Sequence, residues 1–369
     1  MSVEEVKFQA TGRVEAIFRH EQARDEGSEC LAHTAERIAR LLQYECGSAP
    51  RDDRQRIYFV PDHTLTLAEA ARLGIRSELD LYGGVVPHAF VATRAAAHAP
   101  ISADAVVPQS WSYALARMLA SNVLRGYSAF TVMDACIAAK RLLRSGPVRI
   151  HCGDAEPAPA GEALHDLDDC IEAIEAIPLV DLGLRGVVVE HALAEESVHV
   201  VGNARIGAQS VSYLGTRRAA RTVHGVTVHA GCDLVLVQGD FTALDRVGLD
   251  AHERKAVLKA AYYDAAFAHA YRPSFASRRC YDVVIGRNAH GEVRMGVRGP
   301  LWRCSAESPA EVAAMLAFRD LPGLACVRAS TYEAIGAVDL PGDAMVYHRA
   351  RCDAGGTVTR YCTVDMHAS

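Results

Sequence analysis

The order of the expected strands and helices changes near residue 190, and this change restricts the folds open to the chain. Before it, the sequence predicts the strand RIYFVP (56–61), a helix capped by Thr64 over LTLAEAARLGI, and a buried strand after the glycine turn of YGGVVPHAFVAT (82–93). Strands that alternate with helices are typical of a parallel sheet. After it, apolar runs with partial alternation follow one another, from SVHVVGNARIGAQSVSYLG to CDLVLVQGDF, which indicates antiparallel strands. The sequence therefore predicts a mixed fold, α/β in its first part and α+β in its second.

Hydrophobic periodicity and turn residues place the other expected elements. Residues 14–46 have helical spacing, with Ile38, Leu41 and Leu42 on one face, and residues 111–143 have it as well. Gly146-Pro147 ends that second helical segment before the strand VRIHC (148–152). The remaining expectations are a helix over DLDDCIEAIEAI, a strand in GVVVEHAL (186–193), a helix over 255–271, a hairpin over 279–299 turned at 288–291, a helix over 309–321 and a β-rich tail.

Composition and charge exclude several classes of function. The chain has 369 residues, 50% of them hydrophobic, which is enough for two or three domain-sized units. Its net charge is −6 without any long block of like charge, which argues against nucleic acid as a partner. The first thirty residues lack an apolar run of signal-peptide or membrane-spanning length, so we expect a cytoplasmic protein with no membrane partner. Apolar strands with exposed edges make a homodimer an expectation.

The eleven cysteines are scattered singly. The sequence contains no Cys-x-x-Cys pair and no close Cys/His cluster of the kind that structural zinc requires. We therefore interpret these cysteines as small buried hydrophobic residues rather than as metal ligands or nucleophiles.

The central succession of elements resembles the ATP-grasp ligases, in which two α+β subdomains hold ATP between them. It runs from the strand at 148–152 through a helix to the strand ending in Glu190, then through antiparallel strands and a helix to Asp282 and the final hairpin. The resemblance implies an N-terminal Rossmann-like domain (1–108), two ATP-grasp-like subdomains (109–190 and 191–325) and a small β-rich C-terminal tail (326–369). It also implies ATP and Mg²⁺ as cofactors and a small carboxylic acid as substrate.

Matched with that family, two positions agree and three differ. Glu190 stands where a carboxylate would hold adenosine, and Asp282 stands where the first magnesium ligand would be. His151 replaces the expected phosphate-binding lysine, the loop GDAEPAPAG has few glycines, and Gly299-Pro300 replaces the expected metal carboxylate. For Glu190 and Asp282, a solvated strand end and a structural ion pair are the alternatives, and for His151 a core histidine with satisfied hydrogen bonds.

A closer resemblance covers roughly residues 56–320. The phrases LGIRSELDLYGGVVPHAFVATRA, SYLGTRRA, HAGCDLVLVQGDF and SRRCYDVVIG are similar to those of an uncharacterised bacterial family related to ATP-grasp enzymes. With its substitutions at His151 and Gly299-Pro300, the chain is identified as a divergent member of that family.

Four arginines and one histidine complete the predicted site. Guanidinium groups bind phosphate or carboxylate in a bidentate manner, so we predict that Arg217, Arg218 and Arg279 act on the substrate and that Arg278 helps bind the nucleotide. His88 is predicted to contact the substrate from the cleft between domains. The alternatives are solvated surface arginines and a buried structural histidine.

Two hypotheses of function remain open. The first is an ATP-dependent ligase that activates a carboxylate as an acyl phosphate and passes it to an amine, with positive charge stabilising the acyl phosphate. The second is a catalytically silent protein of the same fold that binds a ligand or serves a paralogue as a regulatory or partner subunit. A dehydrogenase is disfavoured because no Gly-x-Gly-x-x-Gly follows a candidate first strand.

Overall fold

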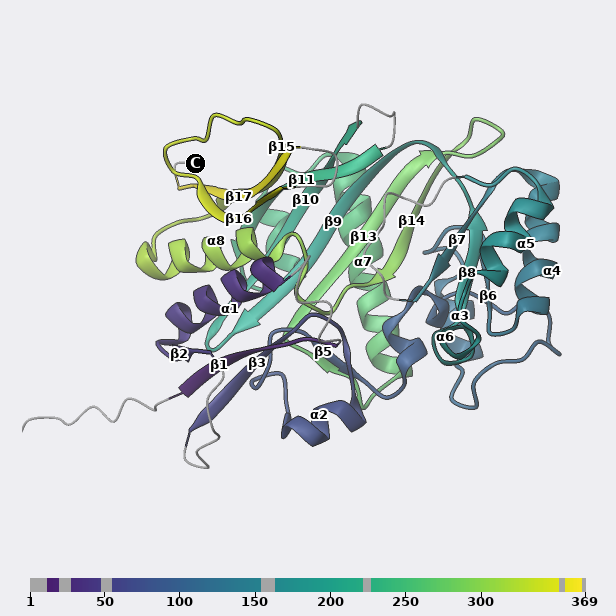
Figure 1. Cartoon of the computed structure of the whole chain (residues 1–369), viewed down its shortest axis with the longest axis horizontal. Helices are drawn as coiled ribbons and strands as arrows, with labels where there is room; N and C mark the ends of the chain where they lie inside the picture. Colours follow the sequence, from purple (N-terminus) through teal and green to yellow (C-terminus); the bar gives the residue numbers. More distant parts are fainter. Residues whose placement is uncertain are drawn as a thin grey trace, which may run out of the picture.

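An eight-stranded antiparallel sheet forms the centre of the computed structural model, which describes residues 12–19, 28–47, 55–153, 163–221, 227–351 and 356–366 (Figure 1). Its strand order is β14-β13-β9-β10-β11-β15-β17-β16. The bounds are β9 (Ala194–Ile206), β10 (Gln209–Arg221), β11 (Thr227–Gln238), β13 (Arg278–Arg287), β14 (Val293–Pro300), β15 (Val327–Ile335), β16 (Met345–Arg351) and β17 (Thr357–Asp365). The antiparallel strands predicted after residue 190 and the hairpin of β13 and β14 are thus confirmed.

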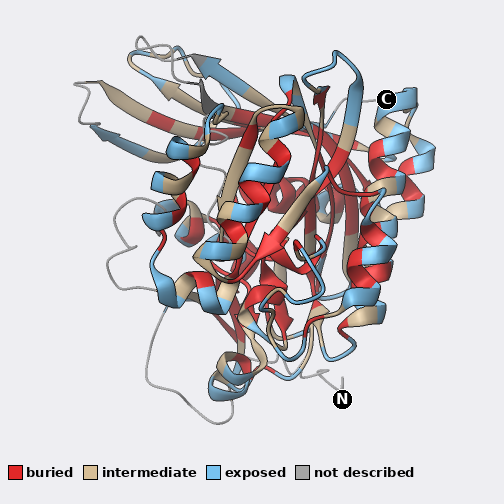
Figure 2. Cartoon of the chain, turned by 90° about the vertical axis from the view of Figure 1, so that its right-hand side faces the viewer, coloured by how far each residue is buried: buried red, intermediate tan, exposed pale blue. Residues whose placement is uncertain are grey.

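Strand alternation gives this sheet two buried faces. Val201 and Leu214 belong to one apolar cluster, whereas the preceding residues, Val200 and Tyr213, belong to another. Helix α7 (Ala251–Ala270) packs in the first cluster, and α1 (Ser28–Leu42) and α8 (Ser308–Asp320) pack in the second. Figure 2 shows the resulting layers, with buried strands in the middle and helices whose outer sides are exposed.

The N-terminal part differs from its prediction at two places. Residues 12–17 form strand β1 (Gly12–Ile17) rather than the start of a helix, because β1 pairs in parallel with β2 (Glu45–Cys46) and β3 (Arg56–Pro61). Thr66, and not Thr64, caps α2 (Leu67–Leu73), since Glu69 completes a reciprocal capping box with Thr66. A further short sheet joins β4 (Leu65–Thr66), β5 (Gly84–Val86) and β12 (Phe275–Ala276).

A smaller antiparallel sheet lies beside the large one, with β8 (Val187–His191) between β6 (Gly126–Ala129) and β7 (Val148–Cys152). Strand β6 separates α3 (Tyr113–Leu119) from α4 (Val132–Leu142), so the helical pattern predicted over 111–143 is wrong at the residues of β6. One face packs against α4, α5 (Leu167–Glu175) and α6 (Leu179–Arg185). The other face contributes Val188 to the apolar cluster it shares with the large sheet and α7.

The chain therefore has a mixed α/β fold with a large antiparallel sheet, as predicted in outline. The β-rich tail is not separate from this sheet, because β15 pairs with β11 and β17 pairs with β15. The predicted domain boundaries stay predictions. Within the described residues, no helix combines the length and apolar character needed to cross a membrane.

Candidate functional site

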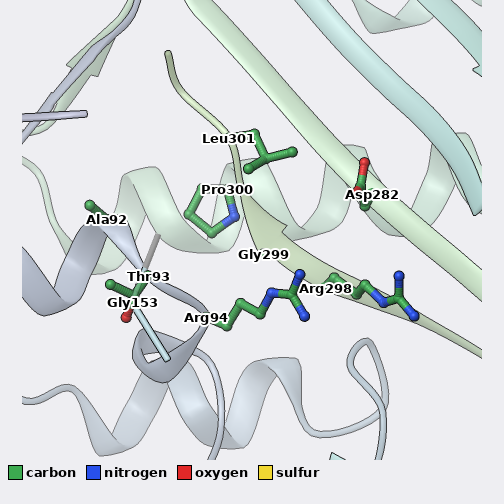
Figure 3. A pocket seen from close by; sticks show the side chains of 9 residues that line it. All are labelled: Ala92, Thr93, Arg94, Gly153, Asp282, Arg298, Gly299, Pro300 and Leu301. Carbon is green, nitrogen blue, oxygen red and sulfur yellow. The ribbon is translucent and has the colours of Figure 1, made fainter. Parts of the chain in front are cut away.

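A small pocket opens between the small sheet and the large sheet (Figure 3). Three segments line it: the 3₁₀ turns η2 (Ala89–Ala92) and η3 (Arg94–Ala96), the residue after β7, and the adjoining parts of β13 and β14. The lining residues are Ala92, Thr93, Arg94, Gly153, Asp282, Arg298, Gly299, Pro300 and Leu301. The enclosed cavity of about 20 Å³ has room for about one water molecule, and so for one end of a small polar group.

Arg94 and Arg298 both line this pocket, and their side chains extend in the same direction (Figure 3). Nη1 of Arg94 and Nε of Arg298 are buried without a hydrogen-bond partner in the described part of the chain. Burial, followed by repulsion from Arg298, lowers the pKa of Arg94 to about 10. Like charges held together in a buried place are costly, and a bound anion would offset that cost.

Glu196 fixes the position of Arg298. Nη2 of Arg298 donates to Oε2 of Glu196 at 2.6 Å, and Arg149 pairs with Oε1 of the same carboxylate. Arg298 is only 5% exposed, so its side chain has little freedom to leave the pocket. One carboxylate thus orients two arginines, a charge-assisted arrangement that is geometrically specific.

Gly299 lets Arg94 approach the end of β14. Its φ of +139° lies in a region that favours glycine, and a Cβ there would stand 2.9 Å from Cγ of Arg94. A glutamate at 299, which the ATP-grasp resemblance led us to expect, would therefore collide with Arg94. The glycine at this position has a steric explanation in this chain.

Asp282 lines the pocket from β13 and forms an ion pair with Arg217. Its Oδ1 accepts from Nε of Arg217 at 3.1 Å and from Nη2 at 3.0 Å, and Arg217 also reaches Glu307 at 2.9 Å. Oδ2 of Asp282 is buried without a hydrogen-bond partner among the described residues. The described ranges contain no group of three His, Cys, Asp or Glu residues suited to a metal ion. The metal role of Asp282 stays a prediction.

The structure brings His151 and Glu190 together, on the face of the small sheet that points toward the large sheet. Register pairs His151 with Val188, so His151, Glu190 and Gly153 share one side of their strands. Nε2 of His151 lies 3.0 Å from Oε1 of Glu190, and Nε2 of His98 lies 3.6 Å from Oε2. Glu190 is 2% exposed, so the solvated strand end considered for it is wrong.

The charge states of Glu190 and His151 follow from the groups around them. Burial raises the pKa of Glu190, but interactions with His151 and His98 outweigh it and keep the pKa well below its usual range. Burial, with repulsion from Arg94, lowers the pKa of His151 to about 4. At neutral pH an ionised Glu190 therefore accepts a hydrogen bond from a neutral imidazole.

Asp282 is the one predicted site residue that lines this pocket, and four of the others make their contacts elsewhere. Arg278 is fully buried and binds Glu311, with Nε 2.9 Å from Oε2, so it ties β13 to α8. Arg279 pairs with Asp264 at 3.4 Å, and Arg218 pairs with Asp233 at 2.6 Å while its guanidinium covers the ring of Tyr332. His88 is exposed and stacks on Phe90, with ring centroids 5.9 Å apart. Their catalytic and binding roles stay predictions.

Sequence reasoning did not single out Arg94, His98, Arg149, Glu196 or Arg298 as site residues. Arg94 and Arg298 stand far apart in the chain and adjoin only through packing of η3 against β14. The alternation of Arg149 and His151 in VRIHC was an available signal, because it places two basic side chains on one face of a strand.

The interpretation of the cysteines is supported for half of those that the structure describes. Cys170, Cys232, Cys280, Cys304 and Cys362 are buried, and all the described cysteines are free thiols. Cys46 is exposed, and four others are partly buried.

Comparison with known proteins corrects the family assignment. The family model that matches the chain is described as a protein of unknown function (DUF3182), and it covers residues 15–362. No ATP-grasp model matches, so the identification of the chain as an ATP-grasp relative was wrong. No curated protein matches the chain.

Proposed function

The chain belongs to the DUF3182 family, and from the charges around its pocket we propose that it binds a small anionic molecule through a phosphate, sulfate or carboxylate group. The observation that carries this proposal is the buried Nη1 of Arg94, which has no hydrogen-bond partner among the described residues and shares the pocket with Arg298. An unpaired donor on a buried cation costs free energy, and an anion between the two guanidinium groups would satisfy both. Arginine is also suited to bidentate contact with such groups.

The pocket's shape supports recognition of one anionic group rather than enclosure of a large ligand. Its enclosed volume of about 20 Å³ is far below the 300–1,000 Å³ of usual pockets for drug-sized ligands.

An ATP-dependent ligase, the first hypothesis from the sequence, has weaker support from this geometry. In such a reaction a carboxylate oxygen attacks the γ-phosphorus of ATP and ADP leaves, and an amine then displaces phosphate from the acyl phosphate. Oδ1 of Asp282 is occupied by Arg217, and the described residues contain no group of three His, Cys, Asp or Glu side chains suited to a metal ion. We therefore favour ligand binding without ATP chemistry, the second hypothesis.

Calorimetric titration tests the proposal. Sulfate, inorganic phosphate and acetate are titrated into the wild-type protein and into Arg94→Gln, with Arg287→Gln as the matched control. Arg287 has a side chain 52% exposed and pairs with Glu195 on the surface. We expect at least one anion to bind, and Arg94→Gln to weaken it tenfold or more, since a hydrogen bond to a charged group contributes about 1.5–3 kcal/mol.

The control should bind within about twofold of wild type, because an exposed ion pair contributes little. Absence of binding by all three anions in folded protein, or unchanged affinity in Arg94→Gln, would refute the proposal. Parallel titrations with ATP, with and without Mg²⁺, and a measurement of ADP release test the ligase hypothesis in the same protein.

A further inference from the structure

His151 lies on the same face of β7 as Gly153, which lines the pocket, and is held there by the buried Glu190. Its ring is hydrogen-bonded to Glu190 at 3.0 Å, and its side chain is 13% exposed. Gly153, two residues further along the same face of β7, lines the pocket. His151 therefore lies beside the anion site without being among the residues that line it.

The groups that act on the imidazole come from three other segments. Arg94 comes from η3, and His98 follows it, with Nδ1 3.4 Å from the backbone oxygen of Arg94. Glu190 comes from β8, and Arg298 comes from β14. The two cations oppose protonation of the ring, whereas the carboxylate of Glu190 favours it.

We propose that His151 takes up a proton when an anion binds between Arg94 and Arg298, so that anion binding at this pocket is coupled to pH. The inference rests on the proposed anion site. A bound anion neutralises the two positive charges that oppose protonation of the ring and leaves Glu190 in place to stabilise the imidazolium. The imidazolium in turn attracts the anion, so each event favours the other, as linkage requires.

The direction in which anion affinity changes with pH follows from the pKa of His151 in the free protein and in the complex. In the free protein the pKa of His151 is lowered to about 4, and in the complex it is higher because the repulsion from the arginines is offset. Protonated His151 is therefore favoured in the complex, and binding strengthens as pH falls. The extra affinity is lost as pH rises through the pKa of the complex, by up to about tenfold per pH unit.

Sulfate is a suitable probe because it stays a dianion throughout this range and exchanges no proton itself. Its binding to the full chain is measured by calorimetry between pH 5 and 8, at each pH in two buffers of different ionisation enthalpy. Proton uptake makes the observed enthalpy depend on the buffer. We expect that dependence in the wild-type protein at pH 5 to 6, together with an affinity that falls as pH rises.

The variant His151→Gln retains a side chain that can donate to Glu190 but cannot take up a proton, and we expect it to bind sulfate with no buffer dependence. The matched control is His191→Gln, on the opposite side of β8, where the ring contacts Ser145. This control should keep the proton uptake of the wild type.

The outcomes distinguish failure of the proposed role of His151 from failure of the proposed anion site. Sulfate binding without buffer dependence in the wild type, or proton uptake that persists in His151→Gln, would overturn the role of His151 and leave the anion site standing. Failure of sulfate, phosphate and acetate to bind at all would overturn both.

Discussion

Removal of the charge of Glu311 is expected to destabilise the protein by about 3 kcal/mol. Glu311 is fully buried on α8, where its carboxylate accepts from Arg278 at 2.9 and 2.5 Å and from the hydroxyl of Tyr82 at 2.6 Å. Breaking a buried ion pair on one side costs about 3–5 kcal/mol. Glu307, 3.9 Å from Arg278, offsets part of the lost charge, so we expect the lower end of that range for Glu311→Gln.

Urea unfolding followed by circular dichroism measures this change. With an m value of about 3 kcal/mol per molar urea, the midpoint should fall by about 1 M. The matched control is Glu292→Gln, from an ion pair with Arg294 whose side chains are 55% and 54% exposed, and it should leave the urea midpoint nearly unchanged because an exposed ion pair contributes little.

A double variant distinguishes the contribution of the Arg278–Glu311 ion pair to stability from the cost of leaving Arg278 buried without its partner. In Arg278→Met/Glu311→Leu both charges are replaced by apolar side chains, so we expect a smaller loss than in Glu311→Gln alone. If Glu311→Gln unfolds at the midpoint of the surface control, the interpretation of Arg278 as the structural anchor of α8 is wrong.

Two further predictions concern local geometry. Gly299→Ala should cost about 1–3 kcal/mol, from its φ of +139° and the contact with Arg94, and should weaken sulfate binding, as thermal unfolding and calorimetry would show. Gly248→Ala, with nothing within 4 Å of the added Cβ, should be nearly neutral, and an equal loss in both variants would contradict the steric argument. Thr66→Ala should lower stability by about 1 kcal/mol through loss of the capping box of α2, and an unchanged unfolding midpoint would show that the cap contributes nothing.

Errors in the predicted elements occurred where nonlocal pairing overrode the local pattern. The segment GYSA of β6 has no strand signal of its own beside two helical stretches, and it is extended because its backbone pairs with β8. Residues 12–17 likewise form a strand because β3 lies beside them. The cap of α2 is different, because the spacing of Thr66 and Glu69 was present in the sequence and identifies the helix start.

The predictions about the site also depended on whether local sequence or tertiary contacts decide where a side chain lies. Glu190 and His151 were singled out as candidates through the resemblance to the ATP-grasp ligases, and the structure places them in contact. We predicted that Arg217, Arg218 and Arg279 act on the substrate and that Arg278 binds the nucleotide. In the structure Arg217 pairs with Asp282, Arg278 is buried against α8, and Arg218 and Arg279 pair elsewhere. Neighbouring residues of a strand point to opposite faces, so consecutive arginines cannot all reach one pocket.

The sequence by itself determined the mixed α/β class, the antiparallel strands after residue 190 and the hairpin of β13 and β14, because periodicity and turn residues act over a few positions. Only the tertiary structure decided that Arg94 meets Arg298, that Glu196 holds Arg298 and that β15–β17 extend the large sheet. These contacts join segments far apart in the chain. Their partners are chosen by the packing of whole sheets and helices, which short sequence patterns do not encode.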